Sequence, residues 1–273
     1  MTASGAADPD RLRRRLDRER AARHEAEAIA ERVTSDLYAA LQELTGLNAS
    51  LRDFVAVAAH DLRAPLTSIL GFTALMRRDW DRHDDASREG FLVAIERSGQ
   101  HLKRLTEDLL TISSIEANAL ATHVQEVQLR PVVEHTLAGL ADTPVELDVS
   151  PQLIVLADPD HLERALTNYL SNAVKYGAPP FALRAQALDA SVDVRVSDCG
   201  AGVPADFVPR LFDRFARADE ARRSGVGGTG LGLAIVRGLA RSNGGDAWYE
   251  TRDPNGACFV LRVPRPIAAG ASL

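Results

Sequence analysis

The stretch FVAVAAHDLRAPLTSILGF, Phe54 to Phe72, has the apolar spacing of a helix and carries one histidine, His60, beside Asp61. Pro65 follows five residues after the histidine. A proline inside a helix removes a backbone hydrogen bond and crowds the carbonyl of residue i−4, which here is Asp61. We therefore expect the helix to bend or loosen beside His60.

The apolar residues that lead into this stretch repeat in steps of four and three. They are Leu37, Leu41, Leu44, Asn48, Leu51, Val55, Ala58 and Leu62. This heptad pattern predicts a coiled coil, and an Asn at an a position favours a parallel dimer. A solvated single helix is the alternative. The heptad places His60 at an f position, away from the seam, so that a buried core histidine is disfavoured.

A second helix is expected after a turn in DWDRHDDAS. The first helix should run from about 51 to 80. Ser87 is the expected N-cap of the second, which should reach about residue 118 with an apolar stripe. The stripe is Phe91, Ile95, Leu102, Leu105, Leu109 and Ile112. Two such αα-hairpins, paired through the seam, would form a dimeric four-helix bundle.

The pattern changes at about residue 121, where short β-like runs begin to alternate with helical ones. The β-like runs are VELDVS, LIVLAD, FALRAQAL, SVDVRVSD, DAWYET and CFVLRV, and the helical runs are RPVVEHTLAGL, DPDHLERALTNYLSNAVKYG and LGLAIVRGLARSN. This alternation predicts an α/β sandwich. The expected fold class is α+β multidomain, with a coiled coil (1–50), a hairpin (51–120), an α/β domain (121–267) and a tail (268–273).

The composition of the chain argues against several classes of protein. The net charge of −6 argues against a protein that binds nucleic acid by neutralising phosphates. Cys199 and Cys258 lie too far apart for a disulfide framework or a metal motif, which favours a reducing cytoplasm. The polar N-terminus is unlike a signal peptide, and no apolar run reaches about 18 residues, so no membrane span is expected.

Three motifs within the α/β region carry groups suited to binding. In ALTNYLSNAVKYG, Asn168 and Asn172 share a helix face, with Lys175 and Tyr176 close behind. Amide oxygens suit Mg²⁺, which usually bridges to phosphates. An ordinary helix with two surface amides is the alternative.

The second motif, VSDCGAGVP, places Asp198 at a strand end before Gly200 and Gly202. A fixed carboxylate there can accept a hydrogen bond from the exocyclic amine of adenine, and the glycines allow a tight turn and a close approach of a ligand. A plain turn with the same DxGxG pattern is the alternative.

The third motif, SGVGGTGLGLAIVRGL, crowds glycines before a helix, where bare backbone N–H groups bind phosphate. A flexible loop is the alternative. Upstream, Phe212 and Phe215 could anchor a mobile lid, and its arginines, Arg217, Arg222 and Arg223, offer cations to a phosphate.

Taken in order with HDLRAPL, these motifs resemble the sensor histidine kinases of two-component signalling over roughly residues 50–265. His60 to Leu66 resembles the H box, Asn168 to Tyr176 the N box, and Asp198 to Gly202 the G1 box. Leu211 to Phe215 resembles the F box, and Gly228 to Gly232 the G2 box. The resemblance implies a dimerisation and histidine-phosphotransfer hairpin followed by a Bergerat-type ATP-binding domain.

The resemblance also implies roles. His60 would accept the γ-phosphoryl group of ATP, with Asp61 as orienting partner and base and Asn168 near the γ-phosphate. Asn172 would hold Mg²⁺. The remaining residues implied in nucleotide binding are Lys175, Tyr176, Asp198, Gly200, Gly202, Phe212, Arg223, Gly228, Thr229, Gly230, Leu231 and Gly232. The phosphoryl group would then pass to an aspartate of a response regulator receiver domain.

Two departures from the family pattern carry expectations. Many relatives have Glu after the histidine, where this chain has Asp61. Relatives that dephosphorylate their regulator usually carry Thr or Asn four positions after the histidine, where this chain has Ala64. We therefore expect weak or absent phosphatase activity of that kind, although Thr67, one turn away, could partly substitute.

Other functions fit fewer of these features. A topoisomerase- or chaperone-type ATPase would not explain the H box and hairpin, and a pure coiled-coil protein would leave the second half unexplained. A non-catalytic, ATP-regulated dimeric scaffold is the remaining alternative. For a kinase, the expected partners are a second copy of the chain, a receiver domain and an upstream sensor protein.

Overall fold

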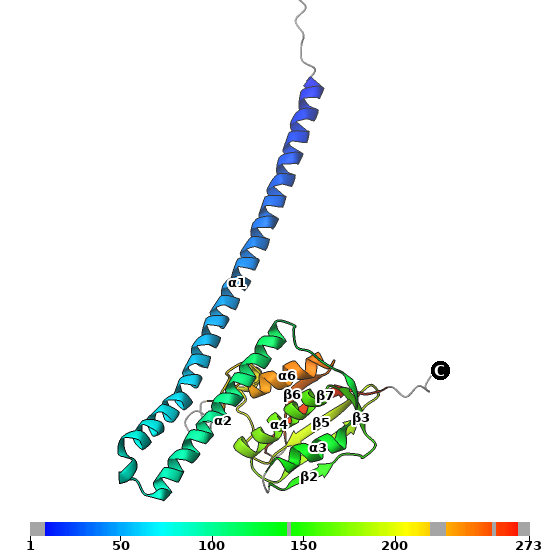
Figure 1. The fold of residues 1–273 in the computed structure, drawn as a ribbon. Coiled ribbons are helices and arrows are strands. Elements are labelled where there is room, and N and C mark those ends of the chain that lie inside the picture. Colours follow the sequence, from blue (N-terminus) through cyan, green and yellow to red (C-terminus); the bar gives the residue numbers. More distant parts are fainter. Residues whose placement is uncertain (1–8, 141–142, 219–227, 253–254, 267–273) are drawn as a thin grey trace, which may run out of the picture. The chain divides into compact units, whose positions relative to one another are not determined.

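The computed structural model describes residues 9–140, 143–218, 228–252 and 255–266. The chain divides into two compact units, Met1–Ala58 and Ala59–Leu273. The first unit is helical wherever it is described, and the second contains His60, a helical hairpin and an α/β domain (Figure 1). Among the described residues, no helix has the length and apolarity needed to cross a membrane.

Helix α1, Pro9–Asp79, is continuous, so the coiled coil and the first hairpin helix of the prediction are one element. The helix passes through Pro65 without ending, although the missing N–H leaves one carbonyl without its helical donor. In the first unit, large apolar side chains of the predicted seam are solvent-exposed in the single chain. These are Leu37, Leu41, Leu44 and Val55.

The prediction of Ser87 as the N-cap of the second hairpin helix is wrong. Helix α2, Asp85–Glu116, follows a short 3₁₀ turn, η1, Trp80–Arg82. Its N-cap is Asp84, whose carboxylate accepts a 2.9 Å hydrogen bond from Ser87 N. The hydrogen bonds from Ser87 lower the pKa of Asp84, because they favour the ionised form. A carboxylate three residues earlier thus caps the helix in place of the hydroxyl.

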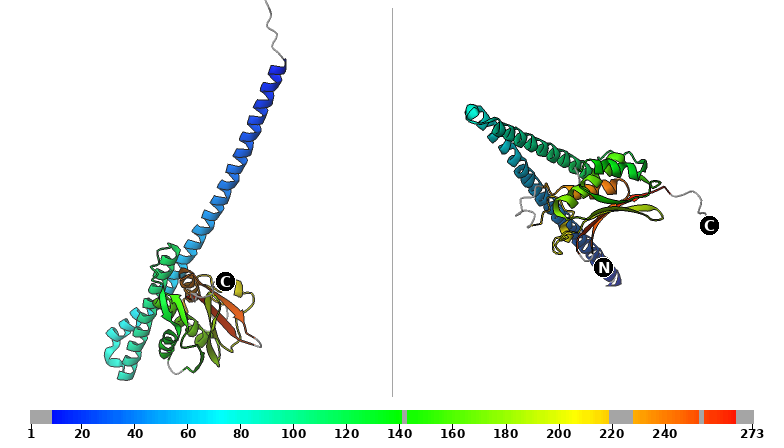
Figure 2. Two further views of the ribbon diagram at one scale, coloured as in Figure 1. Left: turned by 90° about the vertical axis from the view of Figure 1, so that its right-hand side faces the viewer. Right: turned by 90° about the horizontal axis from the view of Figure 1, so that it is seen from below.

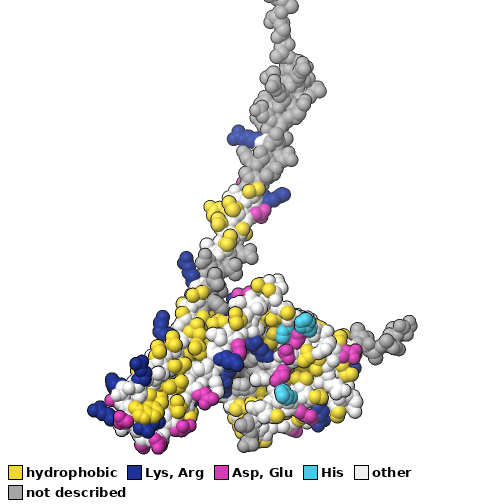
Figure 3. All heavy atoms as spheres, in the orientation of Figure 1, with side chains coloured by type: hydrophobic (Ala, Val, Ile, Leu, Met, Phe, Trp, Pro, Cys, Tyr) yellow, Lys and Arg dark blue, Asp and Glu magenta, His cyan; other side chains and the backbone are white. Residues whose placement is uncertain are grey.

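Side chains of α1 and α2 meet along the hairpin. Phe72 stacks on Phe91 with ring centroids 5.5 Å apart, and Ser98 Oγ donates to Ser68 Oγ at 3.2 Å. Of the predicted stripe on α2, Leu105 and Ile112 are buried and the rest are half-buried. Other apolar side chains of the hairpin are exposed, and Figure 3 shows hydrophobic groups along its surface. They are Leu66, Leu70, Leu92, Val93 and Leu110.

The α/β domain is built on a five-stranded sheet of order β2-β4-β5-β7-β6. The strands are β2 Val145–Asp148, β4 Phe181–Ala187, β5 Ser191–Ser197, β6 Asp246–Thr251 and β7 Ala257–Pro264. Only β2 and β4 pair in parallel within this described sheet. A separate antiparallel pair joins β1, Gln125–Gln128, to β3, Ile154–Ala157.

Three helices cover one face of the sheet, as Figure 2 shows from two directions. They are α3 Leu129–Ala138, α4 Pro159–Tyr176 and α6 Gly232–Ser242, and a 3₁₀ turn, η2, spans Val208–Arg210. Leu166, Tyr169 and Val236 are fully buried in the core between the layers. All six predicted strands and all three predicted helices of the domain are present. Strand β1 was not predicted, because its residues QEVQ are polar apart from Val127.

Candidate active site

His60 lies on the exposed surface of α1, with 79% of its side chain accessible. Its Nδ1 is 3.0 Å from Asp61 Oδ1, while the Asp61 side chain is only 23% exposed. With a proton on Nδ1 donated to this carboxylate, the lone pair of the imidazole lies on Nε2, which points to solvent. The pair thus presents an oriented nitrogen nucleophile.

Nearby hydroxyls on α1 are engaged elsewhere. Thr67 Oγ1 donates a 2.8 Å hydrogen bond to the backbone carbonyl of Arg63, one turn back. Ala64, four residues after His60, has no polar side-chain atom. The described part of this helix surface therefore offers no free hydroxyl at the position where a water would be oriented beside the histidine.

Helix α4 holds the two predicted amides on one half-buried face. Asn168 Nδ2 donates to Arg164 O at 3.0 Å, which turns its oxygen away from its own helix toward Gly232. A Cβ on Gly232 would lie 2.6 Å from that oxygen. Asn172, one turn on, has no hydrogen-bonding partner among the described residues. Its amide is therefore available to a ligand.

Lys175 and Tyr176 end the same helix. Desolvation by the surrounding protein lowers the pKa of Lys175, the Arg104 guanidinium adds to this effect, and the Asp108 carboxylate opposes it. An anion placed beside this ammonium would favour its charged form. The Tyr176 side chain is 46% exposed, and its hydroxyl lies where a Cβ on Gly228 would come within 2.6 Å.

Asp198 is buried at the end of β5, with 3% of its surface exposed. Its Oδ1 accepts a 2.8 Å hydrogen bond from Gly200 N, the only described donor to this carboxylate. Glycines enclose it on three sides, because a Cβ would lie 2.4 Å from its Cγ at Gly177, 3.0 Å from its Oδ1 at Gly200 and 2.1 Å from its backbone oxygen at Gly256. A side chain at any of these three positions would therefore collide with Asp198.

The predicted turn after Asp198 also needs glycine at a second position. Gly202 has φ of +74°, a conformation that side chains rarely adopt, and a Cβ there would lie 2.9 Å from Gly256 O. The Tyr249 hydroxyl accepts a 3.3 Å hydrogen bond from Val203 N. Strand β6 thus supports the loop that follows the buried carboxylate.

The glycine-rich motif leads into the N-terminus of α6, where backbone N–H groups lack helical partners. Gly230 has φ of +68°, and a Cβ on it would lie 2.7 Å from the backbone of Phe215. Thr229 Oγ1 accepts a 3.2 Å hydrogen bond from Leu231 N. The arrangement of residues 228–232 is that of an anion-binding helix start.

The segment between these loops is described in part. The Phe212 ring lies under the Arg237 guanidinium, whose carbon is 4.9 Å from the ring centroid, so the structure places it against α6. The predicted contact of Phe212 with a nucleotide stays a prediction. Arg222 and Arg223, predicted to offer cations, lie outside the described residues.

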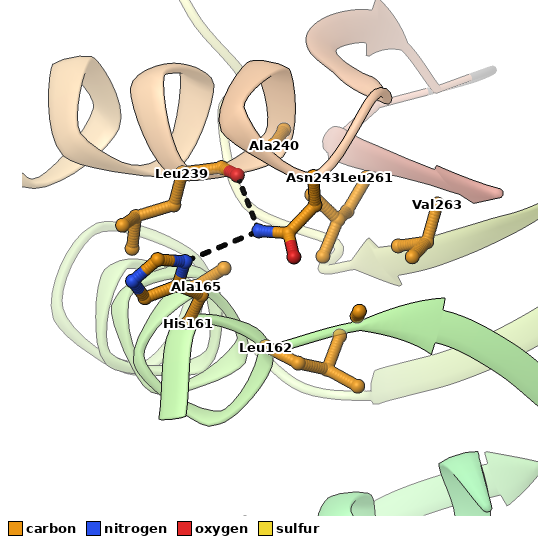
Figure 4. A pocket seen from close by; sticks show the side chains of 9 residues that line it. His161, Leu162, Ala165, Leu239, Ala240, Asn243, Leu261 and Val263 are labelled. Atoms are coloured by element: carbon orange, nitrogen blue, oxygen red, sulfur yellow. Dashed lines mark hydrogen bonds between the residues drawn. The ribbon is translucent and has the colours of Figure 1, made fainter. Parts of the chain in front are cut away.

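Sequence reasoning assigned no role to Asn243, which is buried at the end of α6 (Figure 4). Its Oδ1 accepts from Asp158 N at 2.7 Å, and its Nδ2 donates to Leu239 O at 2.7 Å and lies 3.2 Å from His161 Nδ1. Asn243 therefore ties the end of α6 to the start of α4. Gly177, Gly256 and Arg252, which donates to Asp198 O at 3.2 Å, were also missed.

The chemistry of the donor set fits an adenine nucleotide with a magnesium ion. The fixed carboxylate of Asp198 can accept from an amine, the α6 start can bind phosphate, and the free amide of Asn172 offers an oxygen to Mg²⁺. No cluster of three or more His, Cys, Asp or Glu residues that could hold a metal occurs among the described residues.

Comparisons with known proteins agree with this layout. Residues 50–118 match the His Kinase A (phospho-acceptor) domain, and residues 157–267 match the histidine kinase-, DNA gyrase B-, and HSP90-like ATPase. The chain is 34% identical over 243 residues to the circadian input-output histidine kinase CikA of Synechococcus elongatus, covering 85% of this chain and 32% of that protein.

A probable sensor histidine kinase of Mycobacterium tuberculosis is 38% identical over 199 residues, covering 71% of this chain and 51% of that protein. The solved structure of full-length ShkA in complex with AMPPNP is 28% identical with a TM-score of 0.55, covering 79% of this chain and 47% of that one. The chain thus spans about half or less of the length of these relatives. With a phospho-acceptor domain followed by an ATPase domain, the chain belongs to the sensor histidine kinase family.

Proposed function

We propose that this chain is an ATP-dependent protein-histidine kinase that phosphorylates His60 and passes the phosphoryl group to an aspartate of a response regulator. The observation that carries the proposal is the exposed imidazole whose Nδ1 is held by Asp61, in a chain whose second half is an ATPase domain. In this proposal, residues 51–120 form the phosphotransfer hairpin and residues 121–267 bind ATP.

The chemistry at His60 follows from the tautomer. Nε2 uses its lone pair to form the N–P bond with the γ-phosphoryl group, the bond from phosphorus to the bridging oxygen breaks, and ADP leaves with those electrons. The imidazole gains positive charge as this bond forms. Asp61 stabilises that charge through the Nδ1–H hydrogen bond and can take the proton, as a base beside a nucleophile does.

The nucleotide would be held by preformed groups of the α/β domain. Asp198 would accept from the adenine amine, and Thr229 with the N–H groups at the α6 start would bind phosphate. Asn168 would lie near the γ-phosphate and Lys175 and Tyr176 beside the nucleotide. When bound, Mg²⁺ would neutralise phosphate charge, and Asn172 is the residue that would hold it.

The proposed partners follow from the hairpin and its exposed side chains. The apolar residues exposed on α1 and α2 would be covered by the hairpin of a second copy, giving a homodimeric four-helix bundle. The exposed surface around His60 would receive the receiver domain. Input would come from an upstream sensor protein that acts on the first unit.

We expect phosphatase activity of the orienting-hydroxyl type to be weak or absent. Ala64 cannot orient a water, and the Thr67 hydroxyl already donates to its own helix. Replacing Ala64 with Thr would supply the hydroxyl. Dephosphorylation of a phosphorylated receiver domain should then increase in the Ala64→Thr variant, while autophosphorylation should change little.

The test of the kinase proposal is labelling with γ-labelled Mg·ATP, comparing wild type with His60→Gln. Label that is lost in acid, survives base and disappears in the variant is the expected result, since an N–P bond is acid-labile. His135→Gln is the matched control, because this histidine lies on α3 of the α/β domain with 75% of its side chain exposed, and it should retain the label.

Each other outcome contradicts part of the proposal. Binding of ATP with no label on wild type favours the non-catalytic dimeric scaffold. Label that persists in His60→Gln would show that His60 is not the acceptor. Label that is stable in acid indicates a hydroxyl acceptor, which would rule out histidine chemistry altogether.

A further inference from the structure

One face of α2 is bound to the same loops that form the phosphate end of the candidate site. Asp108 Oδ1 accepts a 2.9 Å hydrogen bond from Arg164 Nη2 on α4, and Thr111 Oγ1 accepts from Arg164 Nη1 at 2.6 Å. Thr229 Oγ1 donates to Asp108 Oδ2 at 3.4 Å. A single carboxylate of the hairpin therefore contacts both the N-box helix and the glycine-rich loop.

The contact continues for two more turns along α2. Ile115 packs on Gly238 of α6, where a Cβ would lie 2.5 Å from its Cδ1. Glu116 forms an ion pair with Arg214 of the F-box segment. Asp108, Thr111 and Ile115 are spaced three and four residues apart, so they share one helix face. This face meets α4 and α6, and the neighbouring Glu116 adds the contact with the F-box segment.

The position of the Asp108 carboxylate is that of an anion at a phosphate site. Through the Thr229 hydroxyl, which accepts from Leu231 N, its charge is connected to the N-terminus of the eleven-residue helix α6. Its other oxygen is paired with the Arg164 guanidinium, and its charge also acts on Lys175. A helix start, a hydroxyl and two cations are the groups that a nucleotide phosphate would use.

We propose that Asp108 is a latch that stands in for a nucleotide phosphate, holding the ATP-binding domain on α2 until a nucleotide displaces it. The proposal rests on the proposed function in one respect, that nucleotide phosphates bind at residues 228–232. Phosphate and the Asp108 carboxylate carry like charge and compete for Thr229, so they cannot both occupy the loop. Binding of nucleotide therefore releases the domain from α2.

Thermodynamic linkage then fixes the direction in which a substitution of Asp108 changes the affinity for nucleotide. Breaking the latch removes a state that excludes phosphate, so the apparent affinity for a phosphate-bearing ligand must rise. Replacing a residue that helped to bind the nucleotide or its ion would instead lower this affinity. Adenosine has the base and sugar but no phosphate, so its affinity should not depend on the charge of Asp108.

The experiment is calorimetric titration of the full chain with Mg·ADP and with adenosine, for wild type, Asp108→Asn and Asp108→Ala. Asp108→Asn keeps the size of the side chain and removes its charge. We expect both variants to bind Mg·ADP at least about fivefold more tightly than wild type. Adenosine affinity should be unchanged.

Glu107→Gln is the matched control. This substitution removes the same charge from α2. The Glu107 side chain, however, is 52% exposed, and its described ion pair is with Lys103 of the same helix, at 3.9 Å. Its Mg·ADP affinity should stay within about twofold of wild type, because exposed charges are screened by solvent.

Unchanged or weaker Mg·ADP binding in Asp108→Asn would overturn the latch. An equal gain in adenosine affinity would also overturn it, because the contact would then obstruct the whole pocket rather than compete with phosphate. Tighter Mg·ADP binding without label on His60 in the kinase assay would leave the latch standing and reject the proposed kinase function.

Discussion

The two ends of the proposed reaction are built in opposite ways. His60 lies on an open helix surface and is oriented by one hydrogen bond, to Asp61. Asp198 is buried, and an added side chain at Gly177, Gly200 or Gly256 would collide with it. In the proposed reaction the acceptor is reached by two domains in turn, the ATP-binding domain of the kinase and a receiver domain, so it must stay exposed. The adenine end serves one ligand and can be preformed.

Because of this difference, substitutions at the two ends should have separable effects on the reaction rate and on the stability of the fold. A substitution at the exposed end should change the rate of phosphorylation and leave the free energy of unfolding almost unchanged, since surface changes stay within about 0.5 kcal/mol. A substitution in the glycine-lined end should change stability and nucleotide binding together. The predictions below test this separation, beginning with the largest effect.

Asp61→Asn should lower the rate of autophosphorylation by roughly 10²- to 10⁴-fold, the usual contribution of a positioned base. The Asn amide can donate to Nδ1, which would move the imidazole proton to Nε2 and remove the nucleophilic lone pair. The measurement is the initial rate of labelling at saturating Mg·ATP, with chemical denaturation in parallel. Asp61→Glu, which keeps the carboxylate, is the control and should retain most of the rate.

A large loss of stability in Asp61→Asn would contradict the separation, because the exposed end would then also be structural. An unchanged rate would show that His60 needs no carboxylate partner.

Gly256→Ala should destabilise the α/β domain by about 3 kcal/mol or more. Its φ of +128° is unfavourable for any side chain, and the added Cβ would lie 2.1 Å from Asp198 O, a backbone atom that cannot move cheaply. Gly139→Ala is the matched control, because its nearest neighbour would be an ordinary 3.5 Å contact. Denaturant unfolding would compare the two variants, and equal stabilities would contradict the steric argument.

The sequence predicted what depends on local pattern. Apolar alternation located six strands of the domain, and DxGxG and the glycine-rich run located two loops of the site. It did not predict β1, since a short edge strand with one buried residue, Val127, has no apolar alternation. Ser87 was wrong as a cap because Asp84, an equally good capping residue, lies three positions earlier and reaches the same helix start.

Contacts between distant parts of the chain could not be predicted from local pattern. Asn243 was given no role, because its partner Asp158 lies 85 residues away. Gly177 ends the motif ALTNYLSNAVKYG without being given a role, and Gly256 stands in no motif. Only the position of Asp198 between them explains why they lack side chains. The contact of Asp108 with Thr229 spans 121 residues. The motifs thus identify the chemical groups, and the fold identifies what constrains them.

Asn243→Ala should destabilise the domain by about 1–3 kcal/mol, because it leaves the buried N–H of Asp158 without its acceptor and removes the side-chain hydrogen bond to Leu239 O. Ser242→Ala, at the exposed neighbouring residue, should change stability by less than about 0.5 kcal/mol. Denaturant midpoints of the two variants provide the comparison. Nucleotide affinity measured well below the midpoint should be retained, since Asn243 lies at the opposite end of α6 from residues 228–232.

The smallest effect concerns pH and the start of α4. Asp158 is buried, and desolvation alone would raise its pKa, yet hydrogen bonds from the backbone N–H groups of His123 and His161 outweigh it and leave the pKa lowered. A carboxyl whose pKa is lower in the folded state stabilises the fold above its unfolded pKa of about 3.9. This contribution is lost as the pH falls through the folded value. Asp158→Asn, which can still cap the helix, should therefore be less stable than wild type at pH 6, and the difference should shrink as acid is added. Unfolding free energies of both proteins from pH 6 to pH 3 would test this, and parallel curves would show that this carboxylate, although buried, contributes nothing that depends on its charge.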